Sequence, residues 1–521
     1  MDTKALRQKI LDLAIRGKLV PQDPNDEPAS VLLERIRAEK QQMVKDGKLK
    51  PKDIKNDTAI FKGDDNLHYE QFADGTVKCI EDEIPFELPD GWAWARLGNI
   101  GEIITGGTPS KSHHEYYGNA FPFFKPADLD QGKKTIISSE YLSEKGKACC
   151  RIIPKFSTAV CCIGSIGKCG YLNVEGTTNQ QINSIIPNID SLYVYYYCSS
   201  DCFSEQLLSL ASATTIAIVN KSKLESVFIP VPPMVEQKRI ANTLDTALEL
   251  IETLEVEKSD ILVAINNVKS KILDLAIRGK LVPQDPNDEP ASVLLERIRA
   301  EKEELIKRGK IKRDKKESVI FKGDDNSYYE KMSTGEVKCI DDELPFVLPE
   351  GWEWCNLSMI GTTNIGLTYR PTDIESDGTI VLRSNNIIND KINLNDVVRV
   401  TAKIRENQYV KANDILICTR NGSKALVGKC AIIGDLNEPA SFGAFMAIYR
   451  TDYYKYVLHY LRSNLFRIVF DDGNSTAINQ LTQDMLKRAL IPLPPLAEQE
   501  RIVDTIDKLL SSLQAIEKSL S

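Results

Sequence analysis

Residues 9–40 read KILDLAIRGKLVPQDPNDEPASVLLERIRAEK, and residues 271–302 repeat this stretch without a single change. A run of this length does not recur by chance, so the chain contains an internal repeat. The copies start at residues 9 and 271, which are 262 positions apart, close to half of the 521-residue chain. The fold should therefore be built from two equivalent halves.

Further matching blocks extend the repeat along the chain. They are IFKGDDN at 60–66 and 320–326, GTVKCIEDEIPFELPDGWAW at 75–94 and GEVKCIDDELPFVLPEGWEW at 335–354, and PVPPMVEQKRI at 230–240 and PLPPLAEQERI at 492–502. The second pair contains all four tryptophans of the chain. The blocks form a repeated frame around two long segments that barely resemble each other.

We expect the two ends of the chain to complete one copy of the frame together. The segment after Pro495 ends where its internal copy is still in a helical pattern, and residues 2–17 begin where that copy continues. Placed end to end, they reproduce the uninterrupted segment 235–279. We therefore expect a circular repeat with a pseudo-twofold axis and with neighbouring termini.

Segment 235–279 carries apolar residues in a heptad pattern, which predicts a helix of about 40 residues, on the order of 60 Å long. Gly279 should end this helix, as Gly17 ends the first copy. The C-terminal segment keeps the same pattern. The predicted scaffold residues are Ile240, Leu244, Ile251, Leu254, Ile261, Ile265 and Ile272 in the central helix, and Ile502, Ile506, Leu509 and Leu513 in the C-terminal helix.

Two such stripes in one chain favour an antiparallel coiled coil. The competing interpretation is that each stripe is the core side of a globular helix, for which the length and the 3.5-residue period are unusual. In each half the run PQDPNDEP predicts a turn that leads into a helix beginning near Pro28 or Pro290. The spacers at 41–91 and 303–351 are either a satellite hairpin or a partner contact.

The two unmatched segments, roughly 95–230 and 355–492, read as mixed strand, loop and helix. AVCCIGSIGKCGYL at 159–172 and DILICTRNGSKALVGKCAII at 414–433 are β-rich runs broken by Gly and Ser. Each contains Gly-Ser before Gly-Lys-Cys, which is consistent with one fold that has diverged. Neither has the GxxxxGK[ST] spacing of a phosphate loop.

These patterns predict a mixed α/β (α+β) protein in which two globular domains are separated by long helices that form an antiparallel coiled coil. The expected parts are N-terminal scaffold helices and a linker at 1–60, a first insert domain at 61–233, central scaffold helices at 234–320, a second insert domain at 321–495 and a C-terminal scaffold helix at 496–521.

The composition excludes several classes of protein. With 42% hydrophobic and 27% charged residues it is typical of a soluble globular protein, and no stretch approaches the ~20 apolar residues of a membrane span. Twelve cysteines without framework spacing indicate reduced thiols and a cytoplasmic location. The cysteines form no paired CxxC and there are only four histidines, so we expect no metal site.

The net charge of −8 alone argues against nucleic acid as a partner. The charge is unevenly distributed, however. Residues 360–492 contain 16 basic and 13 acidic residues, and residues 100–230 contain 11 of each, so the rest of the chain carries −11. Any surface that faces DNA should therefore lie on the two inserts.

The inserts offer recognition groups, and we find no NPPY, DPPY, Walker A, HExxH or GxSxG motif. Arg commonly reads guanine, and Asn or Gln reads adenine, by paired hydrogen bonds. The candidate DNA-binding residues are Thr108, Lys111, Lys125, Lys168, Thr178, Asn179, Gln180 and Gln181 in the first insert, and Arg383, Ser384, Asn385, Asn386, Arg420, Asn421, Ser423 and Lys424 in the second. For each of them the competing interpretation is a solvated polar group at a loop or strand end.

The duplicated layout resembles the specificity (S) subunit of type I restriction-modification systems over the whole chain. The segments that carry the resemblance are PFELPDGWAWARL at 85–97, PFVLPEGWEWCNL at 345–357, GGTPSKSHHEYYG at 106–118, IPVPPMVEQKRI at 229–240 and IPLPPLAEQERI at 491–502. The resemblance implies that each insert is a target recognition domain for one half of a bipartite DNA site, and that the helices set the gap.

The resemblance also implies partners. Such scaffolds bind two methyltransferase (M) subunits, which use S-adenosylmethionine to methylate adenine, and the complex recruits restriction (R) subunits that use ATP and Mg²⁺. This chain would bind double-stranded DNA, hold no cofactor of its own and be catalytically silent. The identical segments 9–40 and 271–302 are candidate docking faces, although a recent duplication would also explain their identity.

Two other classes of function stay open from the sequence. A standalone sequence-specific DNA-binding regulator would need a strong basic patch of its own. A coiled-coil interaction scaffold would leave the inserts without sequence selectivity. A gel shift with the isolated chain distinguishes the first of these from a specificity subunit.

Overall fold

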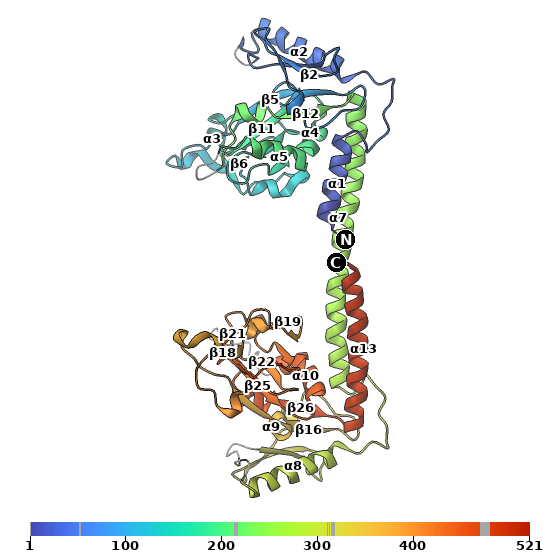
Figure 1. Ribbon diagram of the computed structural model, residues 1–521, viewed down its shortest axis with the longest axis vertical. Helices are drawn as coiled ribbons and strands as arrows, with labels where there is room; N and C mark the ends of the chain where they lie inside the picture. The colour runs from blue at the N-terminus through green and yellow to red at the C-terminus, as the bar shows by residue number, and fades with distance from the viewer. Residues whose placement is uncertain are drawn as a thin grey trace. The chain divides into compact units, whose positions relative to one another are not determined.

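The structure is a computed structural model that describes residues 2–51, 54–212, 217–309, 311, 313, 318–468 and 480–520. The chain divides into two compact units, Met1–Lys258 and Ser259–Ser521. Helix α7 begins in the first unit and ends in the second (Figure 1). Among the described residues, no helix is long and apolar enough to cross a membrane.

Unit 1 combines helices and short strands. Its helices are α1 (Thr3–Ile15), α2 (Ala29–Lys45), α3 (Glu144–Ala148), α4 (Ser191–Cys198), α5 (Asp201–Ser209), α6 (Lys221–Glu225) and the first part of α7 (Met234–Ile277). Its strands are β1 (Ala59–Lys62), β2 (His68–Gln71), β3 (Val77–Cys79), β4 (Ala93–Arg96), β5 (Gly101–Thr105), β6 (Tyr117–Phe124), β7 (Glu140–Leu142), β8 (Thr158–Cys161), β9 (Cys169–Tyr171), β10 (Thr177–Thr178), β11 (Ile182–Pro187) and β12 (Phe228–Val231).

Unit 2 repeats this plan. Its helices are the end of α7, then α8 (Ala291–Lys307), α9 (Leu357–Ile360), α10 (Tyr454–Arg462), α11 (Asn464–Ile468), α12 (Gln483–Arg488) and α13 (Leu496–Leu520). Its strands are β13 (Ser318–Lys322), β14 (Tyr328–Met332), β15 (Val337–Cys339), β16 (Glu353–Asn356), β17 (Thr362–Ile365), β18 (Ile374–Leu382), β19 (Ile387–Ile388), β20 (Lys391–Ile392), β21 (Val398–Val400), β22 (Ile415–Cys418), β23 (Cys430–Ile432), β24 (Ala440–Phe442), β25 (Met446–Arg450) and β26 (Leu490–Leu493).

The long helices pair in antiparallel fashion within each unit (Figure 1). In unit 1, Arg7 near the start of α1 donates to Glu255, and the end of α1 packs in the core that contains the start of α7. In unit 2, Lys269 contacts Glu517 at 2.7 Å, and the beginning of α13 shares a core with the end of α7. The predicted antiparallel helix pairing is confirmed in both units.

One predicted helix seam is only partly buried. The series Leu244, Ile251, Ile265 and Ile272 is at most 7% exposed, and Ile240, Ile502 and Ile506 are completely buried. In contrast, Leu254, Ile261 and Leu509 are 43%, 42% and 38% exposed, so the prediction of a buried seam is wrong for them. In the middle of α7, burial therefore follows the heptad series of Leu244 and not the series of Leu254 and Ile261.

Gly17 and Gly279 end α1 and α7 as predicted. Both have φ of +65°, a conformation that favours glycine. A Cβ atom at either glycine would lie 2.4 Å from the ring of Pro89 or Pro349. The turn therefore needs glycine for its backbone angle and for the close approach of the block that contains the tryptophans.

Each spacer folds into a small antiparallel sheet of three strands, here called a meander. Strands β1, β2 and β3 form the first meander, and β13, β14 and β15 form the second. The expected helices also lie where predicted, because α2 begins directly after Pro28 and α8 directly after Pro290. Of the two interpretations of the spacers, the satellite hairpin is thus confirmed and has one additional strand.

The two inserts share one topology despite their different sequences. A four-stranded sheet has the order β5-β11-β8-β9 in unit 1 and β17-β25-β22-β23 in unit 2. A second sheet joins β6 to β7 and β10 in unit 1, and β18 to β21 and β24 in unit 2, with the same antiparallel and parallel pairings. The predicted divergence from one fold is confirmed, and unit 2 also contains the hairpin β19-β20.

Paired strands and tyrosines fasten each insert to its scaffold helix. Strand β4 pairs with β12 and β16 pairs with β26, just before α7 and α13 begin. The hydroxyl of Tyr193 on α4 donates to the Pro230 carbonyl at 2.7 Å, and that of Tyr456 on α10 donates to the Pro492 carbonyl at 2.7 Å. The inserts are therefore positioned rigidly on the frame within their units.

Candidate nucleic-acid interface

In the first insert, two loops that are distant in sequence meet beside the four-stranded sheet. The loop after β5 holds Thr108, whose hydroxyl donates to the side chain of Gln180, and the backbone N–H of Gly107 donates to the Thr178 carbonyl. Thr108 and Gln180 are exposed, as is Lys111 in the same loop. The structure therefore brings three predicted DNA-binding residues to one exposed surface.

The neighbouring candidates of that segment have a structural role. Thr178 is fully buried and Asn179 is 8% exposed. The Asn179 amide donates to Gln181 Oε1 at 2.9 Å, and its Oδ1 accepts the backbone N–H of Gln181 at 3.1 Å. Thr178 and Asn179 are too buried to reach a base, so assigning them to DNA contact is wrong, and Gln181 serves mainly to close this turn.

Two predicted lysines of the first insert already have carboxylate partners. Lys125 pairs with Glu140, and Lys168 in the β8-β9 loop pairs with Asp130 at 2.6 Å. Asp130 is 75% exposed, so this pair lies at the surface, where an ion pair contributes little and exchanges readily. A phosphate can compete with Asp130 for Lys168 more easily than with the less exposed Glu140 for Lys125.

In the second insert, the two predicted runs lie against each other. The amide of Asn421 donates to the Ser384 hydroxyl at 3.3 Å, which joins the loop after β22 to the loop after β18. Arg420, Ser423 and Lys424 are exposed in the first of these loops. The loop of Arg420 lies between β22 and β23, and the loop of Lys168 lies between β8 and β9. In each four-stranded sheet these are the second and third strands in chain order, so the two loops occupy equivalent positions.

Adjacent residues of the second run differ sharply in their surroundings. Asn385 is exposed and donates to Asp396 at 2.9 Å. Asn386 is 1% exposed, donates to the carbonyls of Asn393 and Asp396, and accepts the backbone N–H of Arg383. Asn386 holds the loop together, so its assignment as a base reader is wrong.

The structure adds residues that the sequence pattern did not single out. Phe445 is 60% exposed, and the guanidinium of Arg420 lies over its ring at 5.5 Å. Thr368 and Arg370 are exposed in the loop after β17, which corresponds to the loop of Thr108 after β5. The sequence could have revealed this second loop through an alignment of GLTYRP at 366–371 with GGTPSK at 106–111.

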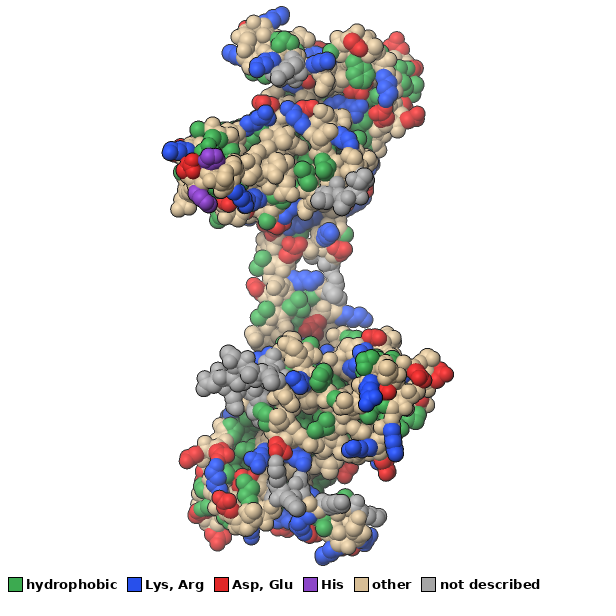
Figure 2. Space-filling view, turned by 90° about the vertical axis from the view of Figure 1, so that its left-hand side faces the viewer, with side chains coloured by type: hydrophobic (Ala, Val, Ile, Leu, Met, Phe, Trp, Pro, Cys, Tyr) green, Lys and Arg blue, Asp and Glu red, His purple; other side chains and the backbone are tan. Residues whose placement is uncertain are grey.

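The charges on these surfaces are mixed. Figure 2 shows Lys and Arg side chains distributed among acidic and uncharged side chains on the face of each unit that it presents. In the second insert, Arg383 lies 3.9 Å from Asp396, which is 81% exposed. The described surface is therefore suited to contacts with individual bases and phosphates, and additional positive charge from partners would strengthen binding.

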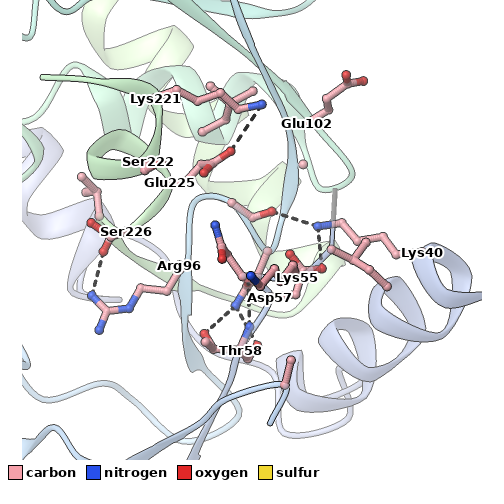
Figure 3. Close-up of a pocket in the computed structure, with 18 of the residues that line it drawn as sticks. Lys40, Lys55, Asp57, Thr58, Arg96, Glu102, Lys221, Ser222, Glu225 and Ser226 are labelled. Atoms are coloured by element: carbon pink, nitrogen blue, oxygen red, sulfur yellow. Dashed lines mark hydrogen bonds and ion pairs between the residues drawn. The ribbon is translucent and has the colours of Figure 1, made fainter. Parts of the chain in front are cut away.

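A cavity of about 1560 Å³ lies elsewhere in unit 1, between α2, the meander and the first insert (Figure 3). Lys40 reaches into it from α2, where it contacts Asp57 at 3.2 Å and donates to the Gly98 carbonyl at 2.8 Å. None of the predicted DNA-binding residues lines this cavity. Its walls carry acidic and basic side chains together, so it has no clear preference for an anion.

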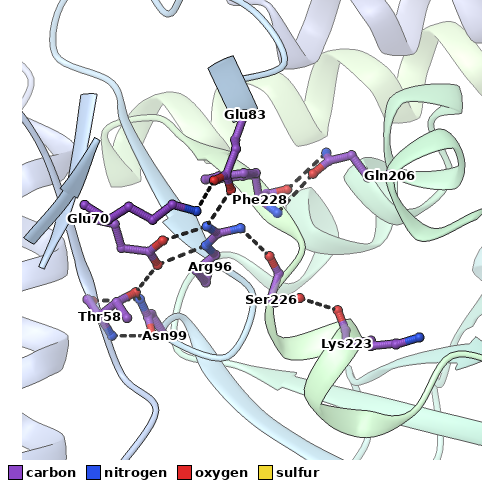
Figure 4. Close-up of polar contacts among 10 residues, drawn as sticks. Thr58, Glu70, Glu83, Arg96, Asn99, Gln206, Lys223, Ser226 and Phe228 are labelled. Atoms are coloured by element: carbon purple, nitrogen blue, oxygen red, sulfur yellow. Dashed lines mark hydrogen bonds and ion pairs between the residues drawn. The ribbon is translucent and has the colours of Figure 1, made fainter. Parts of the chain in front are cut away.

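Arg96 joins the meander to the insert beside that cavity (Figure 4). Its guanidinium donates to both carboxylate oxygens of Glu70, at 3.0 and 2.6 Å, and to the Ser226 carbonyl at 2.7 Å. Burial acts to raise the pKa of Glu70, but the hydrogen bonds from Arg96 and Thr58 outweigh it and hold this pKa below its ordinary value. In unit 2 the position of Arg96 is occupied by Asn356, which donates to Ser318 at 3.0 Å.

A buried pair repeats at the junction of each insert with its scaffold helix. The indole N–H of Trp92 donates to Glu236 at 3.0 Å, and that of Trp352 donates to Glu498 at 2.9 Å. Both glutamates are 1% exposed, and burial raises the pKa of each carboxyl group. The pair fixes the first turn of α7 and of α13 against the block that opens each insert.

The chain matches known proteins along nearly its whole length. The model of the family described as the type I restriction modification DNA specificity domain matches residues 89–266 and 349–521. The chain belongs to this family. The family model thus matches once in each half of the specificity chain, and each match contains one insert with the scaffold helix that follows it.

Two curated relatives from Escherichia coli are similar to this specificity chain throughout. The type I restriction enzyme EcoAI specificity subunit is 31% identical over 568 residues, covering 98% of this chain and 89% of the relative. The EcoEI specificity subunit is 30% identical over 591 residues, covering 99% and 91%. A solved structure on complex assembly and conformational transition of the type I R-M system has the same fold, with a TM-score of 0.57, 17% identity and coverage of 84% and 94%.

Proposed function

We propose that this chain selects the DNA site of a type I restriction-modification complex, and that each insert reads one half of a bipartite double-stranded sequence. The observation that carries this proposal is the pair of inserts with identical topology, whose exposed loops differ while the frame around them repeats. Thr108, Lys111 and Gln180 serve the first half-site. Arg420 and Asn385 serve the second.

We propose further that the chain is catalytically silent and binds no cofactor of its own. Within the described residues, no group of three or more His, Cys, Asp or Glu side chains is arranged to hold a metal ion, and the twelve cysteines are free thiols. S-adenosylmethionine, ATP and Mg²⁺ would then be used by the partner subunits. The restriction subunits would join through the methyltransferase complex.

The repeated frame supports the binding of two methyltransferase subunits. Segments 9–40 and 271–302 are identical, and their exposed residues have equivalent positions in the two units. Val31 and Val293 are 42% and 41% exposed, and each lies on a helix with an exposed arginine that pairs with a glutamate just before that helix. Two equivalent surfaces allow two identical partners to bind one chain.

Methylome sequencing tests the proposed function. A host that expresses this chain with its methyltransferase is compared with a host that lacks only this chain. We expect a split, asymmetric methylated motif that disappears without the chain and loses one half when residues 360–490 are exchanged. Methylation that persisted unchanged without the chain would contradict a role in DNA specificity. Tight binding of duplex by the isolated chain in a gel shift would favour the standalone regulator.

A further inference from the structure

Each meander has an exposed face that carries apolar side chains, here called the outer face. Its apolar members are Phe61, Tyr69, Val77 and Cys79 in unit 1, and Phe321, Tyr329, Val337 and Cys339 in unit 2. Gln71 and Lys331 lie on the same face, because they pair with Val77 and Val337. The phenylalanine and tyrosine rings stack at 5.9 Å in the first meander and 5.8 Å in the second. The four apolar residues therefore have the same arrangement in both meanders.

The opposite face of each meander supplies the packing that holds it in place. Side chains alternate across a strand, so Ile60 and Glu70 point inward between the outer-face residues. Ile60 packs against the small core of Trp94, and Glu70 forms the buried pair with Arg96. On the outer face, Phe61 is 45% and Val77 is 51% exposed, and no other described segment covers them. Stability of the fold does not require these side chains to be apolar.

The two copies of the meander have diverged, but not at the four apolar residues of the outer face. Exposed positions that differ include Leu67, Gln71, Phe72 and Asp74, which correspond to Ser327, Lys331, Met332 and Thr334. The four apolar residues are unchanged between the copies, as is the polar run KGDDN at 62–66 and 322–326. An exposed apolar set that is present in both meanders points to a shared function of the two faces.

The charge around the outer faces indicates what kind of molecule fits them. Apart from the inward-pointing Glu70 and Glu330, residues 59–83 contain six acidic and two basic residues, and residues 318–343 contain six acidic and three basic residues. An acidic rim repels the phosphates of a duplex, whereas an apolar centre with a charged rim is typical of a protein interface. A partner that fits both faces must be present twice and must offer basic residues around an apolar patch.

We propose that the outer face of each meander binds one methyltransferase subunit through such a basic, apolar surface, as a contact additional to the scaffold helices. This inference rests on the proposed function, because that function supplies a partner that binds twice. Both meanders lie outside the residues that the family model matches, so the contact would be separate from the shared specificity domain. The outer face would then increase the affinity for the partner without contacting DNA.

Substitutions in one meander at a time test the inference, because each half serves as a control for the other. The full chain carrying Phe61→Ser and Val77→Ser is titrated with the purified methyltransferase subunit, and stoichiometry and Kd are measured by mass photometry and calorimetry. We expect one of the two sites to weaken by about tenfold or more. The same pair of changes at Phe321 and Val337 should weaken the other site, and the four changes together should weaken both.

Leu67→Ser is the matched control variant. Leu67 is a 38% exposed apolar residue of the same meander, and the other copy already has serine at this position. We expect it to bind two methyltransferase subunits as tightly as the native chain. Equal Kd values for the native and fourfold variant chains, with unchanged thermal unfolding, would overturn the inference.

Two further outcomes have distinct meanings. If the native chain failed to bind the methyltransferase subunit at all, the proposed function would fail and the inference with it. If the native chain alone self-associated in sedimentation and the fourfold variant did not, the outer face would be an interface between copies of this chain, and the inference would be wrong. If the native chain binds two methyltransferase subunits and the fourfold variant binds them equally tightly, the proposed function stays intact. Only the additional contact is then rejected.

Discussion

At the scale of single residues, the neighbours Asn385 and Asn386 have different roles. Asn386 is buried and makes three hydrogen bonds that shape its loop, whereas Asn385 is exposed. We expect Asn386→Ala to lower the free energy of unfolding by about 1–3 kcal/mol, because buried backbone groups lose their partners. Asn385→Ala should change stability by less than about 0.5 kcal/mol and instead alter the methylated half-site.

Urea unfolding and methylome sequencing of the two variants check this contrast. The native chain serves as the reference. A large loss of stability in Asn385→Ala, or an altered motif in a fully stable Asn386→Ala, would contradict the assignment.

The buried glutamates Glu236 and Glu498 predict a dependence on pH. Burial raises the pKa of both carboxyl groups, so the folded chain favours their neutral form. This contribution to stability is fully present below the ordinary pKa of glutamate, about 4.3, and is lost as the pH rises through the raised value. Glu236→Gln with Glu498→Gln keeps an oxygen for each indole N–H but removes the charge.

We therefore expect the double glutamine variant to match the native chain in thermal unfolding near pH 4 and to exceed it near pH 7. The comparison is made between the two chains at each pH, since other groups titrate equally in both. A Tm difference that stayed constant across this range would show that the carboxyl groups do not titrate as the structure indicates.

Arg96 provides a third prediction at this scale. Its side chain neutralises the buried Glu70, whose side chain is 4% exposed. Arg96→Asn leaves that carboxylate without its charged partner, and we expect a loss of about 3 kcal/mol in the free energy of unfolding. In unit 2 the carboxylate of Glu330 accepts a hydrogen bond from the Ser318 hydroxyl, and the position of Arg96 is held by Asn356. The reciprocal change Asn356→Arg is therefore the control. Equal stability of the native and Arg96→Asn chains would contradict the importance of the pair.

The sequence identified the loops of the candidate site but not the orientation of each side chain. Thr178 and Gln180 lie two residues apart in one polar run, yet the first is buried and the second exposed. A turn closed by side-chain hydrogen bonds does not follow a simple period, so residue type alone cannot separate a structural amide from an exposed one. Arg420 and Phe445 meet only through strand pairing between distant segments.

At the scale of elements, the long helix α7 followed directly from its heptad pattern, and its burial was predicted less well. The spacing marks two apolar series on the helix, and in its middle the fold buries only one of them, a choice that the spacing alone does not indicate. The meanders were not predicted in detail. Their strands have three to five residues, and such short runs carry little periodic signal.

Adjacent positions on α7 give a prediction about this element. Ile251 is 3% exposed, whereas Leu250 is 61% exposed. Ile251→Ala should lower the free energy of unfolding by about 2–5 kcal/mol through the cavity that it leaves. Leu250→Ala should cost less than about 0.5 kcal/mol. Denaturant unfolding followed by circular dichroism measures both, and equal costs would contradict the burial of Ile251.

At the scale of the whole molecule, the repeated frame predicts the symmetry of the recognised site. Both inserts connect to the frame through equivalent strand pairs, β4-β12 and β16-β26, so residues 355–492 can be replaced by a second copy of residues 95–230. Such a chain carries the same loops twice. If the circular repeat places the halves about a twofold axis, the two identical inserts read inverted copies of one half-site.

We therefore expect methylome sequencing of the duplicated-insert chain to show a palindromic split motif whose half-site equals one half of the native motif. The reciprocal chain, with residues 355–492 placed in both positions, should give a palindrome of the other half. Together the two chains assign each half-site to its insert. A motif made of direct repeats would show that the halves are related by translation and would contradict the twofold axis, because the orientation of the two half-sites follows the orientation of the two inserts.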